Sequence, residues 1–372
     1  MIPDAVFNES VFQFFNPIRQ YLDDPTVTDI CINGPFLVFV ERRGKLELTD
    51  ARFEDREALV AALRNCAQFV NKELSDQRPI LEGRLPDGSR IEAIVPPAAP
   101  DGPHVSIRKF SKTALTIESL VARDSLSAVA AEALNAFIVA KLNILVAGGT
   151  GTGKTSLLNA LSALIPSDER VVVIEDSKEV QLQHIDCVQL EARPGDAKGR
   201  GAVTIRDLFR ATLRLRPDRI VVGEIRGGEA LEILQAMTSG HGGCLATLHA
   251  TYPRDTVTRL ETMAMMSDID MPLAALRSQI ASAVDLIVQV SRLRDGSRKV
   301  SHISEVIRFD AATGAYELQD LFVREYRSEG EGQGVESELV PTRAVPRCAE
   351  KLREHGVTLP AEMGVALRGG RR

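Results

Sequence analysis

One glycine-rich segment constrains the fold of this 372-residue chain more than any other feature. It has the sequence Gly148-Gly149-Thr150-Gly151-Thr152-Gly153-Lys154-Thr155 and matches the spacing GxxxxGK[ST] in full. The apolar run NILVA precedes it, and SLLNALSALI, which has helical spacing, follows it. A strand, a glycine-rich turn and a helix in this order are typical of a phosphate-binding loop, so we expect an α/β domain around it.

The chemistry of this segment suits a nucleoside triphosphate. Glycines let the backbone curl around an anion with its N–H groups pointing inward. The N-terminus of the following helix adds roughly half a positive charge at the same place. We expect residues 148–156, Ser156 included, to bind a nucleoside triphosphate, with Lys154 on the β- and γ-phosphates and Thr155 on Mg²⁺. The alternative is an accidental Gly-Lys-Thr in a turn, which the flanking strand and helix disfavour.

The rest of the chain divides into segments of different pattern. Its length suggests two domains, and a 44% share of hydrophobic residues is enough for sizeable cores. From NILVA onward, short β-rich runs alternate with helical segments, which is typical of a mainly parallel sheet. We expect an N-terminal segment (1–17), an α+β domain (18–110), a linker (111–125), a phosphate-binding α/β domain (126–326) and a C-terminal extension (327–372).

The pattern of the N-terminal domain predicts strands around one helix. DICINGP and LVFVERRGKLEL have the pattern of strands, and EALVAALRNCAQFV has apolar residues at helical spacing. GRLPDGSRIEAIVPP predicts a hairpin that turns at Asp87-Gly88, and HVSIRKF predicts a further strand. In the C-terminal extension, the polar run RSEGEGQGVESELV (327–340) predicts a mobile loop or an extended hairpin.

Acidic residues follow two of the predicted strands. Glu224 ends the run IVVGE, and a carboxylate at the carboxyl end of a parallel strand faces the ligand crevice. We expect Glu224 to polarise the attacking water or to hold Mg²⁺ through a water molecule, although a solvated strand end is the alternative. The run IEDSKE adds Glu175, Asp176 and Glu179. If these three carboxylates lie beside phosphates, a metal ion or an arginine must neutralise their negative charge. The alternative is that they form an ordinary surface turn.

Two histidines flank the predicted strand CLATLHA. His249 closes the strand, and His241 follows Gly240 at the end of the preceding predicted helix. Either imidazole could hydrogen-bond a γ-phosphate and so sense its loss. A structural role is the other interpretation, and His249 is the better candidate for the functional one.

The motifs GGTGTGKT, VVVIEDSKEVQL, RPDRIVVGEIRGGEA and SGHGGCLATLHA, in this order, resemble those of the secretion ATPases of type II and type IV systems and of type IV pili. In that family they are called Walker A, Asp box, Walker B with its glutamate, and His box. RPGDAKGRGAVTIRDLFRATLRLRPDRI, IASAVDLIVQVSRLRDGSRKVSHISEV and LVPTRAVPRCAEKLREHGVTLP resemble the CpaF (TadA) branch, the motor of tight-adherence (Flp/Tad) pili. The resemblance runs from about residue 18 to residue 363.

The resemblance implies a homohexamer whose subunits join a PAS-like N-terminal α+β domain to a RecA-like P-loop ATPase domain. It assigns catalytic roles to Glu224, Glu179 and Lys154. It also assigns the two histidines, His241 and His249, to the nucleotide. No tetracysteine zinc motif is present, which disfavours the pilus-extension and type II secretion branches.

Arginines of the family's N-terminal domain and linker approach the γ-phosphate, some of them across a subunit interface. Arg90 in GSRIEA and Arg108 in SIRKF match them, and Arg84 is a weaker match. An ATP–Mg²⁺ site with several acidic neighbours needs such cations, and an arginine finger is worth roughly 10³–10⁵ in rate in other P-loop enzymes. Exposed strand arginines without a role are the alternative.

Charge and hydropathy restrict the partners. The net charge of −6 and the lack of a basic run with aromatic residues disfavour a nucleic-acid partner. No apolar run could span a bilayer, and the start MIPDAVFNES lacks the basic region of a signal peptide. We therefore expect a cytoplasmic protein that meets inner-membrane platform proteins peripherally, as the resemblance implies. Five scattered cysteines predict neither a disulfide framework nor a zinc site.

The function expected from the sequence is an ATP- and Mg²⁺-dependent motor that powers assembly or retraction of a Tad/Flp-type IV pilus. A type IV secretion or conjugation ATPase is the alternative within the family. A RecA-type nucleic-acid translocase is a rival of another class, which the acidic composition disfavours. A non-catalytic nucleotide-binding scaffold is a minor option.

Overall fold

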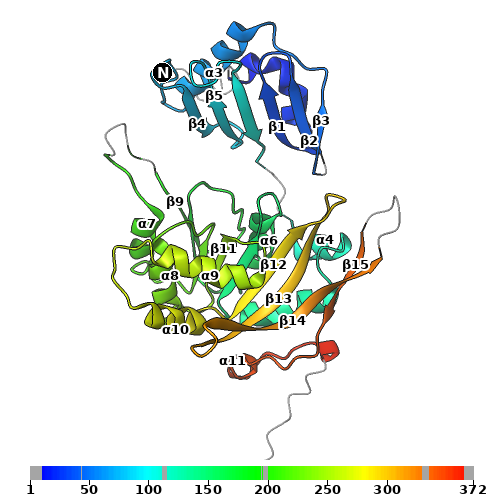
Figure 1. Ribbon diagram of the computed structural model, residues 1–372, viewed down its shortest axis with the longest axis vertical. Coiled ribbons are helices and arrows are strands. Elements are labelled where there is room, and N and C mark those ends of the chain that lie inside the picture. The colour runs from blue at the N-terminus through cyan, green and yellow to red at the C-terminus, as the bar shows by residue number, and fades with distance from the viewer. Residues whose placement is uncertain are drawn as a thin grey trace, which may run out of the picture. The chain divides into compact units, whose positions relative to one another are not determined.

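The computed structural model describes residues 11–42, 44–110, 115–193, 195, 200–328 and 335–363. The chain divides into two compact units, Met1–Thr113 and Ala114–Arg372 (Figure 1). Each unit has its own β-sheet and its own hydrophobic core, so the two are described one at a time.

The first unit is an antiparallel sheet covered on one face by helices. Its six strands follow the order β3-β2-β1-β6-β5-β4. The helix α3 begins at Asp55, whose carboxylate accepts a hydrogen bond of 2.7 Å from the amide of Ala58. The elements are η1 (Asn16–Ile18), α2 (Arg19–Asp23), β1 (Val27–Asn33), β2 (Val38–Arg42), β3 (Lys45–Leu48), α3 (Arg56–Phe69), β4 (Ile80–Arg84), β5 (Arg90–Ile94) and β6 (His104–Arg108).

The strands, the helix and the hairpin predicted for this unit are confirmed. Gly88 has a φ of 90° in the β4–β5 turn, a conformation that side chains with a Cβ resist. The core, however, begins before residue 18. Val11 and Phe15 are fully buried and pack with Leu59 and the inward residues of the sheet. The predicted N-terminal segment (1–17) therefore contributes to the core of this unit.

The second unit is built on a nine-stranded sheet of order β15-β14-β13-β12-β7-β11-β10-β8-β9. Strands from β12 to β9 pair in parallel, and β12 to β15 pair antiparallel. The strands are β7 (Ile144–Gly148), β8 (Val171–Glu175), β9 (Cys187–Glu191), β10 (Arg219–Val222), β11 (Leu245–His249), β12 (Leu286–Arg292), β13 (Arg298–Asp310), β14 (Ala315–Ser328) and β15 (Glu336–Pro341).

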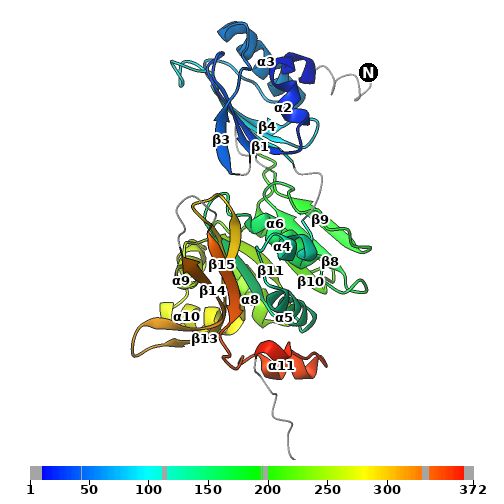
Figure 2. The same cartoon turned by 90° about the vertical axis from the view of Figure 1, so that its right-hand side faces the viewer.

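Helices cover both faces of the parallel part (Figures 1 and 2). Ile144 and Val146 of β7 face one core with α5 and α6, while Leu145 and Ala147 face the other core with α8 and α9. Burial on both faces explains the unbroken apolar runs in these strands. The helices are α4 (Ile117–Ala122), α5 (Ala128–Val139), α6 (Lys154–Ser162), α7 (Ile205–Thr212), α8 (Glu229–Thr238), α9 (Pro253–Ala264), α10 (Leu273–Ala283), α11 (Ala349–Glu354) and η2 (Ala361–Met363).

The predicted fold class, a small α+β domain followed by a larger α/β domain with a mainly parallel sheet, is confirmed. Two local features differ from the sequence prediction. Helix α4 lies within the predicted linker (111–125), and β15, from the predicted C-terminal extension, completes the sheet of the second unit. Residues 329–334 of the predicted loop lie outside the described residues. In the part of the chain that the structure describes, no helix has the length and apolarity needed to cross a membrane.

Candidate active site

The four neighbouring strands β7, β11, β10 and β8 end at one edge of the sheet, and most of the predicted site residues in the second unit lie there. His249 at the end of β11 is level with Gly148 at the end of β7. Glu175 ends β8, and Glu224 follows β10, the strand beside it. The carboxyl edge of a parallel sheet is where ligands bind in such folds.

The phosphate-binding loop connects β7 to α6, as the sequence predicts. Gly148 allows no side chain, because a Cβ would come within 2.5 Å of Thr152 Oγ1 and 2.7 Å of the carbonyl oxygen of Val290. Gly151 and Gly153 have φ angles of 69° and 92°. Gly153 caps α6, so Lys154, Thr155 and Ser156 form the first turn of that helix, where backbone N–H groups point toward an anion.

Lys154 is buried at the centre of this edge, with 8% of its surface exposed. Its ammonium donates a hydrogen bond of 2.9 Å to the carbonyl oxygen of Gly149 and lies 3.4 and 3.5 Å from the two ring nitrogens of His249. The hydroxyl of Thr152 donates to the same carbonyl oxygen at 2.9 Å. Lysine, loop and His249 thus form one bonded group.

Glu224 and His249 form the next contact. His249 Nε2 lies 2.7 Å from Glu224 Oε1. Burial lowers the pKa of His249, and the positive charge of Lys154 lowers it further, against the opposing effect of Glu224. The imidazole is therefore neutral at pH 7 and lies between the Glu224 carboxylate and the Lys154 ammonium.

Arg226 is a site residue that the sequence analysis did not single out. Its Nε and Nη2 both lie 2.6 Å from Glu224 Oε2, and its Nη1 lies 2.7 Å from Asp176 Oδ2. Glu179 also adds to the negative field at this guanidinium. Arg226 is thus the arginine that balances the acidic strand ends. The motif GEIRGGEA contains it two residues after Glu224, which was the available signal.

The three carboxylates after β8 have different environments. Glu175 is buried, and its Oε1 accepts hydrogen bonds from the amides of Glu179 and Val180 at 2.9 and 2.8 Å. It therefore shapes the loop. Asp176 is exposed and paired with Arg226, and Glu179 is half-buried. Glu179 thus belongs to the charged group around Arg226 through its negative field.

Two further arginines that the sequence analysis did not single out flank the phosphate-binding loop. Arg298 Nε donates to the carbonyl oxygen of Gly151 at 2.8 Å, and Arg292 Nη1 lies 3.8 Å from a Cβ built on Gly151. Arg292 and Arg298 are directly opposite each other on β12 and β13. Like charges in that position repel, and a phosphate in the loop would relieve the repulsion.

His241 does not join this group. It precedes the amino end of β11, whereas His249 closes that strand. Leu245–His249 alone covers roughly 13 Å at 3.3 Å per residue, so His241 lies at the opposite edge of the sheet from the phosphate-binding loop of its own chain. Contact between His241 and a nucleotide stays a prediction, and it would require the nucleotide of another subunit.

The arginines predicted in the first unit lie side by side. Arg84 is opposite Arg90, and Arg90 is opposite Arg108, on the three neighbouring strands β4, β5 and β6. They share the face away from the core, because Ile91 and Ile107, next to them in the sequence, point into it. Arg108 is paired with Asp29 of β1, its Nε lying 3.0 Å from Asp29 Oδ1. The approach of these arginines to the γ-phosphate stays a prediction.

The residues at this edge fit ATP with Mg²⁺. The loop at Gly148 is a cradle that any Cβ would fill, and Thr155, in the first turn of α6, has the hydroxyl that such sites place on Mg²⁺. Among the described residues, no group of three or more His, Cys, Asp or Glu side chains is arranged as a metal cage.

Comparisons with known proteins agree with this architecture. The profile of the family described as type II/IV secretion system protein matches residues 13–333. A candidate conjugal transfer protein of Mycobacterium tuberculosis is 36% identical over 293 residues, which cover 77% of this chain and 83% of that protein. The type IV secretion system protein VirB11 of Brucella suis is 35% identical over 338 residues, covering 82% of this chain and 93% of that protein.

A solved structure supports the fold alone. The X-ray structure of the Legionella pneumophila ATPase DotB superposes with a TM-score of 0.57 at 21% identity, covering 81% of this chain and 82% of that one. The family profile spans both units described above, and the two relatives align over most of their own length. The chain therefore belongs to the type II/IV secretion system protein family.

Proposed function

We propose that this protein is an ATP-hydrolysing motor of a type IV secretion or conjugation system. The observation that carries the proposal is the series of close contacts from Lys154 through His249 to Glu224 beside the phosphate-binding loop. Family membership supports the secretion role. The relatives named above are a VirB11 protein and a candidate conjugal transfer protein, and they favour this alternative over the Tad/Flp pilus.

The residues have distinct tasks in this mechanism. The loop amides and Lys154 bind the β- and γ-phosphates, for which Lys154 exchanges the Gly149 carbonyl oxygen for phosphate oxygens. Thr155 would hold Mg²⁺, which neutralises charge on the phosphates when bound. Glu224 accepts a proton from the attacking water or orients it, and Glu179 is proposed to assist through the charged group around Arg226. His249 keeps the Glu224 carboxylate and the Lys154 ammonium in fixed positions.

Two substitutions test this assignment. Lys154→Ala is expected to abolish both ATP binding and turnover, because it removes the buried cation of the loop. Glu224→Gln is expected to keep ATP binding and lower kcat by roughly 10²–10⁴, the range of general acid–base catalysis. Phosphate release and binding of a fluorescent ATP analogue separate the two effects. Turnover at the wild-type rate in either variant contradicts the assignment. Arg343→Ala, an exposed substitution outside the site, is the control for differences in expression and purification and should keep the wild-type rate.

We also propose a homohexamer that meets inner-membrane platform proteins from the cytoplasmic side. Family membership supports this assembly, and the neighbouring strand positions of Arg84, Arg90 and Arg108 suit arginines that approach a γ-phosphate. Light scattering with and without ATP analogue tests the oligomer. A chain that stays monomeric at all protein and nucleotide concentrations contradicts it.

A Tad/Flp pilus motor is the second candidate, supported by the branch-specific resemblance of residues 193–220 and 280–306. Co-purification from the native host distinguishes the two. Channel components of a secretion apparatus support the first proposal, and pilin with prepilin peptidase supports the second.

A further inference from the structure

The start of β13 connects the phosphate-binding loop to the segment that follows α4. Arg298 Nε donates to the carbonyl oxygen of Gly151 at 2.8 Å. The carbonyl oxygen of the same Arg298 accepts a hydrogen bond of 2.7 Å from the hydroxyl of Ser125. One residue thus contacts the loop through its side chain and the α4–α5 segment through its backbone.

Four more hydrogen bonds hold the same segment to β13 and its neighbour. The amide of Val300 donates to the carbonyl oxygen of Ser125 at 2.8 Å, and Lys299 Nζ donates to that of Arg123 at 3.1 Å. Arg324 of β14 donates to the carbonyl oxygens of Asp124 and Ser125 at 3.2 and 3.1 Å. Residues 123–125 therefore form a short docked segment, fixed by every residue from 298 to 300.

Arg324 is the anchor of this arrangement. Only 4% of its surface is exposed, and its other contacts are Val300 O at 2.8 Å and the carbonyl and hydroxyl oxygens of Ser337 at 3.3 and 3.2 Å. Burial lowers the pKa of Arg324 and that of Lys299. Two buried cations lose favourable free energy if their hydrogen bonds to carbonyl oxygens are broken. These bonds therefore hold residues 123–125 in a defined position.

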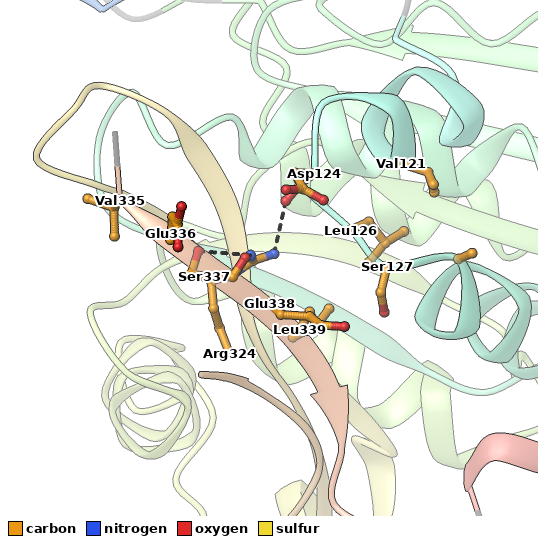
Figure 3. Close-up of a pocket in the computed structure, with 11 residues that line it drawn as sticks. Val121, Asp124, Leu126, Ser127, Arg324, Val335, Glu336, Ser337, Glu338 and Leu339 are labelled. Carbon is orange, nitrogen blue, oxygen red and sulfur yellow. Dashed lines mark hydrogen bonds between the residues drawn. The ribbon is translucent and has the colours of Figure 1, made fainter. Parts of the chain in front are cut away.

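A cavity of about 580 Å³ borders the docked segment. Figure 3 shows Arg324 between Asp124 on one side and Ser337 on the other, with Leu126 and Leu339 on the walls. Asp124 itself has a φ of 59°, which is unfavourable for a residue with a Cβ. The segment therefore lies at the border of a cavity, and its hydrogen bonds to β13 and β14 hold it there.

We propose that Arg298 and Arg324 are positioning residues that couple the phosphate-binding loop to residues 123–125. Arg298 acts on the loop directly, and Arg324 acts through the docked segment and Val300. The inference rests on the proposed ATP binding. Coupling between two sites is reciprocal, so ATP in the loop strengthens docking of the segment, and docking of the segment strengthens ATP binding by the same factor.

The first test uses Ser125→Ala, which removes one hydroxyl that touches neither the loop nor a nucleotide. We expect the KM for ATP to rise roughly 5- to 10-fold with kcat changed less, within the range of measured couplings. Arg298→Gln should raise KM at least as much, and the double variant should be no worse than Arg298→Gln alone. Glu336→Ala, which lines the same cavity outside these bonds, is the matched control and should leave both constants unchanged.

The second test follows hydrogen exchange, which distinguishes coupling from simple loss of stability. A non-hydrolysable ATP analogue should slow exchange at the amide of Val300 and in residues 123–126 of the wild-type chain. It should not do so in Arg298→Gln, assayed at saturating analogue. Arg324→Met removes both the charge and the guanidinium donors, whereas Arg324→Lys keeps the charge alone. Circular dichroism checks that both variants fold. Protection of residues 123–126 by the analogue should be lost in Arg324→Met and partly retained in Arg324→Lys.

The outcomes separate this inference from the proposed function. If the wild-type chain binds no ATP, both fall. If it binds and hydrolyses ATP while Ser125→Ala and Arg298→Gln keep the wild-type KM, or the analogue protects residues 123–126 equally in Arg298→Gln, the coupling is overturned and the ATPase proposal stands.

Discussion

The two ends of the parallel strands in the second unit carry the same kinds of side chain in different environments. At the carboxyl end these are Lys154, Glu224, His249 and Arg226; at the amino end they are Lys141, Glu169, His241 and Arg219. At the carboxyl end the Arg226 side chain is 51% exposed, whereas at the amino end that of Arg219 is 0% exposed and its guanidinium is paired with Glu169. Residue types alone therefore do not define the site.

Backbone geometry explains the difference. The carboxyl end has a glycine-rich loop and a helix N-terminus, so backbone N–H groups are available to a ligand. The amino end is closed, because Gly243 packs on Arg219 so tightly that a Cβ would come within 2.3 Å of Nη1. One end can bind a ligand and the other holds the sheet together.

The largest expected effect is at the closed end. Glu169→Ala removes the carboxylate partner of a fully buried arginine, and breaking a buried pair in this way costs about 3–5 kcal/mol of unfolding free energy. Urea unfolding followed by circular dichroism measures it. Adding Arg219→Met should recover most of the loss, because no buried charge then remains. A Glu169→Ala chain as stable as the wild type would show that the charged residues at the amino end do not stabilise the fold.

Substitutions at the carboxyl end of the parallel strands should change the catalytic rate more than the stability. Arg226→Ala is expected to lower kcat on the order of 100-fold, because Glu224 loses both contacts on Oε2 and a displacement of about 1 Å is enough for such a loss. The melting temperature should change little, since ion pairs of a half-exposed side chain contribute about 0–1 kcal/mol. Steady-state kinetics beside thermal melting give the comparison. Arg226→Lys, which keeps the charge without the fork, should be intermediate.

The two histidines, one at each end of β11, should also differ in their effect on turnover. His249→Ala is expected to lower kcat roughly tenfold, because it removes the imidazole that lies 2.7 Å from the Glu224 carboxylate and positions it. His241→Ala should leave turnover within about twofold in a chain held monomeric by dilution. Equal losses in both variants under those conditions would contradict the placement of His241 at the opposite edge.

The smallest expected effect is a pH dependence of stability. The folded-state pKa of His249 is lowered below 6.5, so the unfolded state binds more protons between the two values. The contribution of His249 to the free energy of unfolding is fully present above pH 6.5 and is lost as the pH falls through the lowered pKa. His249→Asn should flatten the unfolding free energy in that window, and an unchanged profile would show that His249 does not titrate as described.

Much of the site was predictable because it is local in sequence. Residues 148–155 determine a strand end, a turn and a helix start within eight positions, and Gly148, Gly151 and Gly153 each have a steric or conformational reason to be glycine. Glu224 and His249 were predictable as strand ends, since parallel strands bring their carboxyl ends together.

Other parts depend on contacts between distant segments. Arg226 contacts Asp176, 50 residues away and just after β8, and Arg298 contacts Gly151, 147 residues away. No periodicity or spacing encodes those pairs. The burial of Val11 and Phe15 in the first core was missed for the same reason.

The sequence by itself determined the phosphate-binding loop, the alternation of strands and helices, and the family. Tertiary structure alone decided which charged residues face a ligand and which hold the sheet together. The physical reason is that the energy of a charged side chain depends on its burial and on its partner, and both are set by segments far away in the chain.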